Sequence, residues 1–375
     1  MSSNLDIKDG AEGEMARTNF DQIEPDNNKT KNKSDIEKPP MSLGPPSGPP
    51  PDGGLVAWLQ VAAGFMIFFN TWGIINTILA GIAGARLLCR HRRRLALYAY
   101  SITDSDVFMG LAIGIASSGS SLGGVIYPIV LYKLLGEIGF PWAVRVIGFI
   151  ALATFILPLA VMQVRVRAPK PRALIDWSAF VDMPFIVFTL GLLFAFIGNS
   201  VLIFYVSFYP QDSGFTDQSL SFYMVSIFNA GSVLGRIVPN ALSDRIGVFN
   251  TMAPTTLLLG VTIYCMRGVL NAAGMIVLSI VTGFLSGVVV ALPPVCFRVL
   301  TENKSMIGTR VGQGFAIAGL GLLIGGPSAG AILGGTQPLE WTGVWVFGGT
   351  TGVIGAFIFF IVRFMKAGFT LNIKA

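Results

Sequence analysis

The stretch GFAIAGLGLLIGGPSAGAILGG, residues 314–335, decides the fold class of this chain. It contains no charged residue, and a helix needs about 20 consecutive apolar residues to cross the hydrocarbon core of a bilayer. Its many small residues let neighbouring helix backbones approach closely, which is typical of helix packing in lipid. The stretch therefore predicts a helix that spans a membrane.

Similar apolar runs lie on both sides of this stretch along the chain. With the run that contains it, the predicted spans are 55–79, 108–134, 142–164, 184–209, 219–243, 250–270, 273–297, 307–334 and 342–365. The fold class expected from these runs is all-α: a polytopic membrane protein of about nine spans.

The composition of the chain supports this class. Its 375 residues are 53% hydrophobic and only 12% charged, whereas a soluble domain carries about 25% charged residues. One His and three Cys without metal-binding spacing exclude a zinc site and a disulfide scaffold. We also find no nucleotide-binding loop and no nucleophile with a His partner. The chain is therefore expected to be no enzyme, with no catalytic residue, no metal ligand and no cofactor.

Charge is distributed unevenly along the chain. Residues 1–54 hold ten acidic and six basic residues, whereas 55–375 hold ten acidic and twenty basic ones. Lys and Arg collect in cytoplasmic loops, so we attribute the basic character to the lipid bilayer and expect no nucleic-acid partner. The basic loops place the C-terminus in the cytoplasm. The default location is the cell membrane, with a vacuolar or other internal membrane as the open alternative.

The front of the chain conflicts with this orientation. Residues 1–51 are polar and then Pro-rich, which predicts a disordered cytoplasmic tail. Span 55–79 would then run outward, yet span 108–134 must also begin inside. The segment 80–106 between them is rich in Arg and resists translocation. Either 55–89 forms a tight hairpin, or sequence is missing between these two spans.

Several motifs resemble one transporter family. DGGLVAW (52–58) resembles the entry motif of the monocarboxylate transporter-like branch of the major facilitator superfamily, in its fungal form. GIASSGSSLGGVIYP (114–128) and GFPWAVRVIGF (139–149) resemble the fifth helix and the start of the sixth. GRIVPNALSDRIG (235–247) resembles the loop motif that follows helix eight.

This resemblance implies a twelve-helix fold of two six-helix halves, here without helices two to four. The N-terminal half is then incomplete, and the substrate cavity lies between the halves. The implied organisation is a tail (1–51), an incomplete N-terminal bundle (52–134) with the basic segment 80–106, the last helix of that half (135–165), a cytoplasmic linker (166–182), a C-terminal six-helix bundle (183–366) and a second tail (367–375).

Arg236 is the sharpest candidate for a functional residue. It lies eight residues before Asp244, about 12 Å deeper in the membrane at 1.5 Å per residue. An intramembrane Arg normally faces a partner or an aqueous cavity, and its fork can hold a carboxylate. In the family this Arg binds the substrate carboxylate; the family's acid and Lys are here Ser232 and Asn76. A structural Arg, tied to helix-end carbonyls, is the alternative.

Amides and a loop motif complete the candidate site. Asn229, Asn199 and Asn76 are candidates for substrate binding, although amides in apolar spans also join helices to one another. Asp244, Arg245 and Gly247 are assigned to gating: the carboxylate would cap the next helix and Gly247 would permit a tight turn. Arg145, next to Trp142, is read as an interfacial anchor, with a place in the pathway as the alternative.

The function expected from these features is secondary transport by alternating access. The substrate would be a small organic anion, monocarboxylate-like, or a related metabolite. Because no acid lies in the middle of a span, proton coupling is not supported by the residues. Two alternatives stay open: an exporter of a fungal secondary metabolite, and a truncated remnant or regulatory membrane protein that transports nothing.

Overall fold

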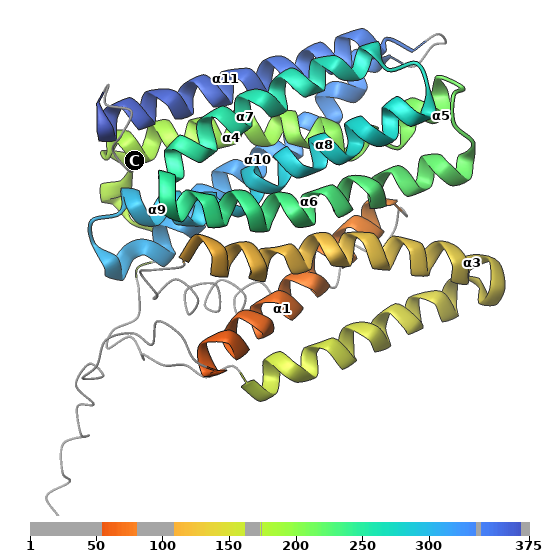
Figure 1. Cartoon of the computed structure of the whole chain (residues 1–375), viewed down its shortest axis with the longest axis horizontal. Coiled ribbons are helices and arrows are strands. Elements are labelled where there is room, and N and C mark those ends of the chain that lie inside the picture. The colour runs from red at the N-terminus through yellow and green to blue at the C-terminus, as the bar shows by residue number, and fades with distance from the viewer. Residues whose placement is uncertain (1–54, 81–108, 162–172, 174, 335–338, 369–375) are drawn as a thin grey trace, which may run out of the picture. The chain divides into compact units, whose positions relative to one another are not determined.

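The computed structural model describes residues 55–80, 109–161, 173, 175–334 and 339–368, without the side chains of 55–57, 71–80 and 109. Every described element is a helix (Figure 1). The longer helices are α1 (Leu55–Ala80), α3 (Met109–Val161), α4 (Met183–Tyr205), α6 (Gln218–Ile246), α7 (Val248–Cys265), α8 (Ala272–Ala291), α10 (Ile307–Leu333) and α11 (Trp341–Ala367). The short ones are α5 (Phe208–Asp212), α9 (Pro293–Leu300), η2 (Trp177–Phe180), η3 (Met266–Gly268) and η4 (Lys304–Met306).

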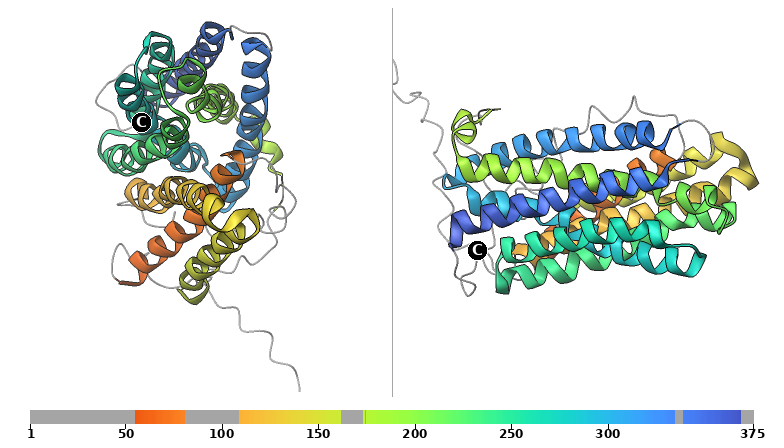
Figure 2. Two further views of the ribbon diagram at one scale, coloured as in Figure 1. Left: turned by 90° about the vertical axis from the view of Figure 1, so that its right-hand side faces the viewer. Right: turned by 90° about the horizontal axis from the view of Figure 1, so that it is seen from above.

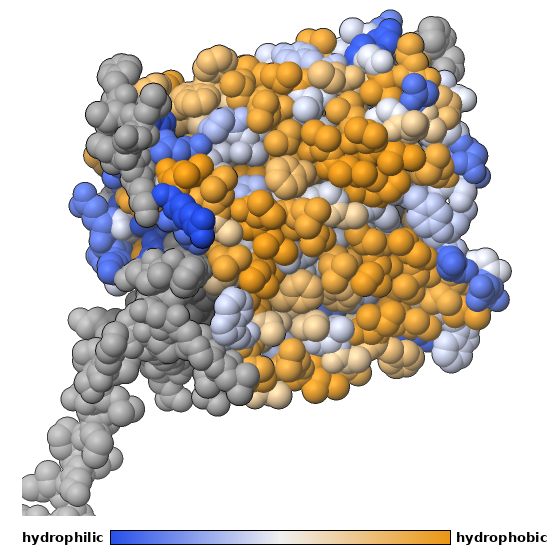
Figure 3. Space-filling model, viewed as in Figure 1, coloured by the Kyte–Doolittle hydropathy of each residue, from blue (hydrophilic) through white to orange (hydrophobic). Residues whose placement is uncertain are grey.

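The surface of residues 48–375, which form one compact unit, has the polarity of a membrane protein. Hydrophobic side chains cover a broad middle band, and hydrophilic ones gather towards its two ends (Figure 3). Large apolar side chains point outward, among them Leu323 and Leu159, which are 71% and 77% exposed. Such exposure is costly in water but favourable against lipid tails. The all-α polytopic membrane fold predicted from the sequence is therefore confirmed.

Within the described residues, and with α3 counted once, seven helices are long and apolar enough to cross a membrane. Two of the expected spans, 108–134 and 142–164, form the two arms of α3. Its backbone leaves the helical conformation at Gly139, with φ 73° and ψ 168°, where the chain doubles back (Figure 1). Gly adopts positive φ without a steric penalty, which permits this reversal. Helix α1 runs for 26 residues, and its described side chains are those of 58–70.

The six helices from α4 to α11 pack into a bundle with a continuous apolar core. Helix α4 contacts α10 and α11, α6 contacts α8, and α7 contacts α11, as the end view in Figure 2 shows. Aromatic rings in edge-to-face and tilted contacts fill the centre: Phe188 meets Phe249, Phe297 and Phe359 at centroid distances of 4.9 to 5.8 Å. This bundle supplies every residue that lines the cavity described below.

Helices α1 and α3 pack against each other, and the first arm of α3 packs against α6. A buried polar network joins α1 to both arms of α3. The Tyr127 hydroxyl donates to Oδ1 of Asn70 at 2.5 Å, and Nδ2 of Asn70 donates to Oγ1 of Thr154 at 2.8 Å. An amide in a span thus joins helices here, one of the two roles expected for such residues.

Several predictions fall on residues that the structure does not describe. These are the tail 1–51, the basic segment 80–106, most of the linker and most of the C-terminal tail. The backbone of Asn76 belongs to α1, but its side chain lies outside the described set.

Candidate functional site

A small cavity opens inside the bundle between α4, α6 and α8. About 20 Å³ of it is accessible to the centre of a water molecule, which is room for water and far less than the volume of a metabolite site. Any larger molecule would have to enter by movement of the surrounding helices. The lining residues are Asn199, Ile203, Val206, Val225, Phe228, Asn229, Ser232, Arg236, Ser286 and Val290. Four of the five residues assigned to substrate binding are in this set.

Arg236 is the one charged residue of the lining, and its side chain is only 6% exposed. Its described hydrogen-bond partners are all neutral oxygens. Nε donates to Oγ of Ser232 at 3.3 Å, and Nη1 donates to the carbonyl oxygen of Ser117 at 2.7 Å and to the hydroxyl of Ser120. Among the described residues, no carboxylate pairs with this guanidinium and Nη2 has no acceptor. A buried cation held only by dipoles is costly, and it favours any anion that reaches it.

Two amides face the same cavity from different helices. Oδ1 of Asn199 accepts a hydrogen bond from Oγ of Ser286 at 2.5 Å, and Nδ2 of Asn229 donates to the carbonyl of Val225 at 2.8 Å. Within the described residues, the other polar atom of each amide forms no hydrogen bond. Each amide therefore keeps one atom that could meet a polar ligand. The cavity thus combines one cation with neutral donors and acceptors.

Asp244 caps a helix, but not the one expected. Its Oδ1 accepts from the amide of Gly110 at 2.8 Å and its Oδ2 from the amide of Leu111 at 3.1 Å. These amides belong to the first turn of α3, where a carboxylate neutralises unpaired N–H groups and the positive end of the helix dipole. The sequence predicted a cap on α7, the helix that follows Asp244, whereas these two bonds are to α3. A sequence shows which helix comes next but not which one packs alongside.

The other two residues of the loop motif, Arg245 and Gly247, have different roles. Gly247 joins α6 to α7 with φ 103°, a backbone conformation that only Gly adopts readily. Arg245 is exposed and pairs with no described residue. The geometry therefore gives Gly247 a clear turn-forming role, whereas for Arg245 it provides no partner.

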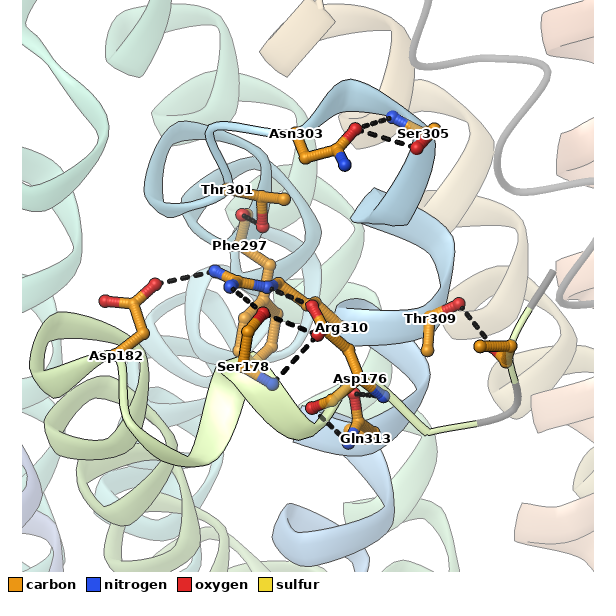
Figure 4. Close-up of polar contacts among 11 residues, drawn as sticks. Asp176, Ser178, Asp182, Phe297, Thr301, Asn303, Ser305, Thr309, Arg310 and Gln313 are labelled. Atoms are coloured by element: carbon orange, nitrogen blue, oxygen red, sulfur yellow. Dashed lines mark hydrogen bonds and ion pairs between the residues drawn. The ribbon is translucent and has the colours of Figure 1, made fainter.

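A second charged cluster, which the sequence analysis missed, lies at the start of α10 (Figure 4). Arg310 is 8% exposed and pairs with two carboxylates: Nε contacts Oδ2 of Asp176 at 2.8 Å, and Nη1 contacts Oδ2 of Asp182 at 2.6 Å. Ser178 and Gln313 add hydrogen bonds to Asp176. The sequence showed Arg310 only as one of the basic loop residues. Its pairing depends on how the segment before α4 folds back onto α10.

The Arg310 cluster pairs its cation with two carboxylates, in contrast to Arg236. The Arg310 guanidinium beside Asp176, helped by hydrogen bonds from Ser178, holds the pKa of this carboxyl below its usual range. Because Arg310 already binds both acids, we assign the cluster a structural role: it holds the segment before α4 against α10. Arg145 is different again: it is exposed and stacks over the Trp142 ring at 4.8 Å, the contact expected of an interfacial anchor.

Comparisons with known proteins agree on the family. The model of the Major Facilitator Superfamily matches residues 105–305. A solved transporter of that superfamily, FucP in the outward conformation, matches with a TM-score of 0.54 at 12% identity, over 82% of this chain and 86% of that one. At this identity the likeness shows the fold alone.

Three fungal relatives carry descriptive names. The MFS-type transporter dbaD of Emericella nidulans is 41% identical over 82% of this chain and 86% of its own length. The aspyridones efflux protein apdF of the same fungus is 35% identical over 59% of this chain and 45% of its own. The agnestins efflux protein AgnL12 of Paecilomyces divaricatus is 35% identical over 71% of this chain and 60% of its own. The chain thus spans only about half the length of the two efflux proteins.

The alignment with dbaD has more positions than this chain contributes residues to it. It runs over 381 positions, whereas 82% of 375 residues is about 307. About 74 positions of that relative therefore have no counterpart in this chain.

Proposed function

Because this chain belongs to the Major Facilitator Superfamily, we propose that it exports a small, oxygen-rich secondary metabolite by alternating access. The metabolite carries an acidic or strongly polar group that Arg236 binds. Two relatives named as efflux proteins support the export reading, which was the alternative function expected from the sequence. No relative's name supports a monocarboxylate substrate, so the acidic group rests on Arg236 alone.

The single observation that carries this proposal is the buried guanidinium of Arg236 in a cavity without any acid. A carboxylate or enolate oxygen that reaches Nη2 would gain a charge-assisted hydrogen bond and neutralise a charge that the protein leaves uncompensated. Asn199 and Asn229 would add neutral contacts to other oxygens of the same molecule. Apolar neighbours such as Phe228 and Val290 would cover its hydrocarbon part.

The small size of the cavity fits a transport cycle rather than a permanent binding site. In alternating access, the helices around a central site separate on one side of the membrane and then on the other. The seam between α3 and α6, capped by Asp244 on the N–H groups of Gly110 and Leu111, is a contact that such a cycle would open and close. We assign Asp244 and Gly247 to that gate and leave Arg245 as its exposed basic neighbour.

No carboxylate or His lines the cavity, so this proposal includes no proton-binding residue. The proposed location remains the cell membrane, with both ends of the chain in the cytoplasm. This is the orientation in which the basic loops face inward.

The test is a metabolite profile of the source fungus with and without the gene. We expect at least one acidic, oxygen-rich metabolite to move from the medium into the cells on deletion. Re-expression of the wild-type chain or of Arg145→Ala should restore its export. Arg236→Ala should restore less than about a tenth, since a hydrogen bond to a charged group is worth about 1.5–3 kcal/mol. An unchanged profile on deletion would refute the proposal.

A second candidate function follows from the positions missing relative to dbaD. About 74 residues are enough for three spans of about 25 residues each, the number of helices that the sequence resemblance leaves out. A chain without them would be a regulatory membrane protein or a remnant that transports nothing. In that case, gene deletion would leave metabolite export unchanged while the protein still accumulates in the membrane.

A further inference from the structure

The substrate cavity is lined entirely by the C-terminal bundle, yet its one cation is held by a helix from outside that bundle. Both described contacts of Nη1 of Arg236 are with α3, at the carbonyl oxygen of Ser117 and the hydroxyl of Ser120. Neither serine lines the cavity. The contact on the cavity side is the long hydrogen bond from Nε to Ser232, at 3.3 Å.

This division leaves one edge of the guanidinium available. The two hydrogens of Nη1 are directed at two oxygens of α3, whereas Nη2 has no described acceptor and Nε holds only a weak one. A carboxylate can bind a guanidinium through two parallel N–H bonds, either at Nη1 and Nη2 or along the side formed by Nε and Nη2. With Nη1 engaged, the side edge, whose Nε contacts Ser232 of the lining, is the one left for a ligand.

From this geometry we infer that Ser117 and Ser120 of α3 are positioning residues for Arg236, and that the guanidinium meets the substrate with its Nε–Nη2 edge. The inference rests on the proposed function and adds the orientation of its anchor. An unrestrained Arg side chain samples many rotamers, and ordering it on binding reduces affinity. Two bonds to α3 order it in advance.

The backbone makes this contact possible. Gly114 lies about one helical turn before Ser117, and a Cβ there would come within 2.4 Å of the carbonyl oxygen of Arg236. Only Gly lets α3 and α6 approach this closely. Oγ of Ser120 also donates to the Ser117 carbonyl at 2.8 Å, so both acceptors are fixed relative to each other. Ser121 adds a bond to Ser232 at 3.1 Å across the same seam.

The same stretch provides a matched control. Oγ of Ser118 donates to the carbonyl of Ile115 at 2.7 Å, a local bond of the same type, and Ser118 is as buried as Ser120 but has no described contact with Arg236. Ser118→Ala thus removes a buried hydroxyl and its local hydrogen bond from the same helix turn. A difference between Ser118→Ala and Ser120→Ala reports the contact with Arg236.

The experiment is a titration of the purified full chain with benzoate, a simple aromatic carboxylate. Binding is measured by the increase in the unfolding temperature of the protein. We expect Ser120→Ala to weaken benzoate binding by about 3- to 10-fold, because the Ser117 carbonyl still holds Nη1. Ser120→Thr, which keeps the hydroxyl, should bind like the wild type, as should Ser118→Ala. In an Arg236→Ala background, Ser120→Ala should have no effect on the residual binding.

Two kinds of result would overturn the inference while leaving the proposed function intact, and a third would overturn both. Ser120→Ala could bind benzoate as the wild type does, or more tightly, which would make the serine a competitor of the substrate. It could also weaken binding equally without Arg236, so that it acts by another route. If Arg236→Ala itself binds benzoate like the wild type, the anchor assigned under the proposed function fails, and the inference fails with it.

Discussion

The C-terminal bundle and the α1–α3 segment bury very different amounts of their apolar surface. In the most apolar window of α4, 67% of the residues are buried; the share is 61% in the span of α8, 50% in α6, α7 and α11, and 33% in the span of α10. In α3 it is 17%. The C-terminal helices bury apolar side chains against one another, whereas the second arm of α3 exposes residues such as Phe149 and Ile156. The same kind of substitution should therefore have different effects on stability in the C-terminal bundle, which has its own core, and in the α1–α3 segment.

The largest expected effect compares one glycine in each region. A Cβ at Gly235 would come within 1.9 Å of the Phe284 carbonyl oxygen, and one at Gly119 within 2.0 Å of that of Phe65. Gly235→Val should prevent the bundle from folding, because a backbone cannot yield at a helix contact and overpacking costs about 1–3 kcal/mol or more. Gly119→Val should displace α1 and leave the bundle intact.

Membrane-inserted yield and limited proteolysis would measure both variants. Gly319→Val is the control, since nothing lies within 4 Å of the added Cβ. Equal loss of folded protein in Gly119→Val and Gly235→Val would show that the two regions fold as one.

The next effect concerns the Arg310 cluster at the edge of the bundle. Arg310→Ala would leave Asp176 and Asp182 without their cation and should lower the free energy of unfolding by about 3–5 kcal/mol. Arg310→Lys keeps the charge but not the fork that reaches both acids, so its loss should be smaller. Thermal unfolding in detergent is the measurement. Arg310→Ala as stable as the wild type would contradict the structural role of the cluster.

A pH dependence follows from the same cluster. Folding lowers the pKa of Asp176 below its ordinary value of 3.8 through its contact with Arg310. The unfolded chain then binds more protons in this range, so stability is complete above about pH 4 and is lost as pH falls through the lower, folded pKa. Unfolding measured from pH 6 to pH 3 should show this loss. Asp176→Asn should be less stable at pH 6 and change less below pH 4; a parallel decline in both would contradict the assignment.

The smallest effect belongs to the α1–α3 segment. Tyr127→Phe removes one hydrogen bond of the network with Asn70 and Thr154, and interhelical hydrogen bonds in membranes average about 0.6 kcal/mol. Protease resistance of α3 should fall slightly, with no change in the C-terminal bundle. Tyr132→Phe is the control, because the Tyr132 hydroxyl bonds to no described residue. A loss of bundle stability in Tyr127→Phe would mean that the network supports the whole unit.

The sequence predicted the helical membrane fold and the burial of Arg236 because both follow from local composition and depth along a helix. It missed what depends on packing between distant segments. Asp244 caps α3, 133 and 134 positions away from the amides it binds but adjacent in space. In the sequence, Arg310 is one of several basic residues near a predicted loop. In the structure, it is buried and forms ion pairs with Asp176 and Asp182. By contrast, the reversal at Gly139 lies between the predicted spans 108–134 and 142–164, which form the two arms of α3.

The most direct test of the central claim is efflux from liposomes that contain the purified chain. They would be loaded with the metabolite that gene deletion retains in cells. The account predicts efflux faster than from protein-free liposomes, lost in Arg236→Ala and retained in Arg145→Ala. Wild-type efflux no faster than from protein-free liposomes, or equal efflux in Arg236→Ala, would contradict it.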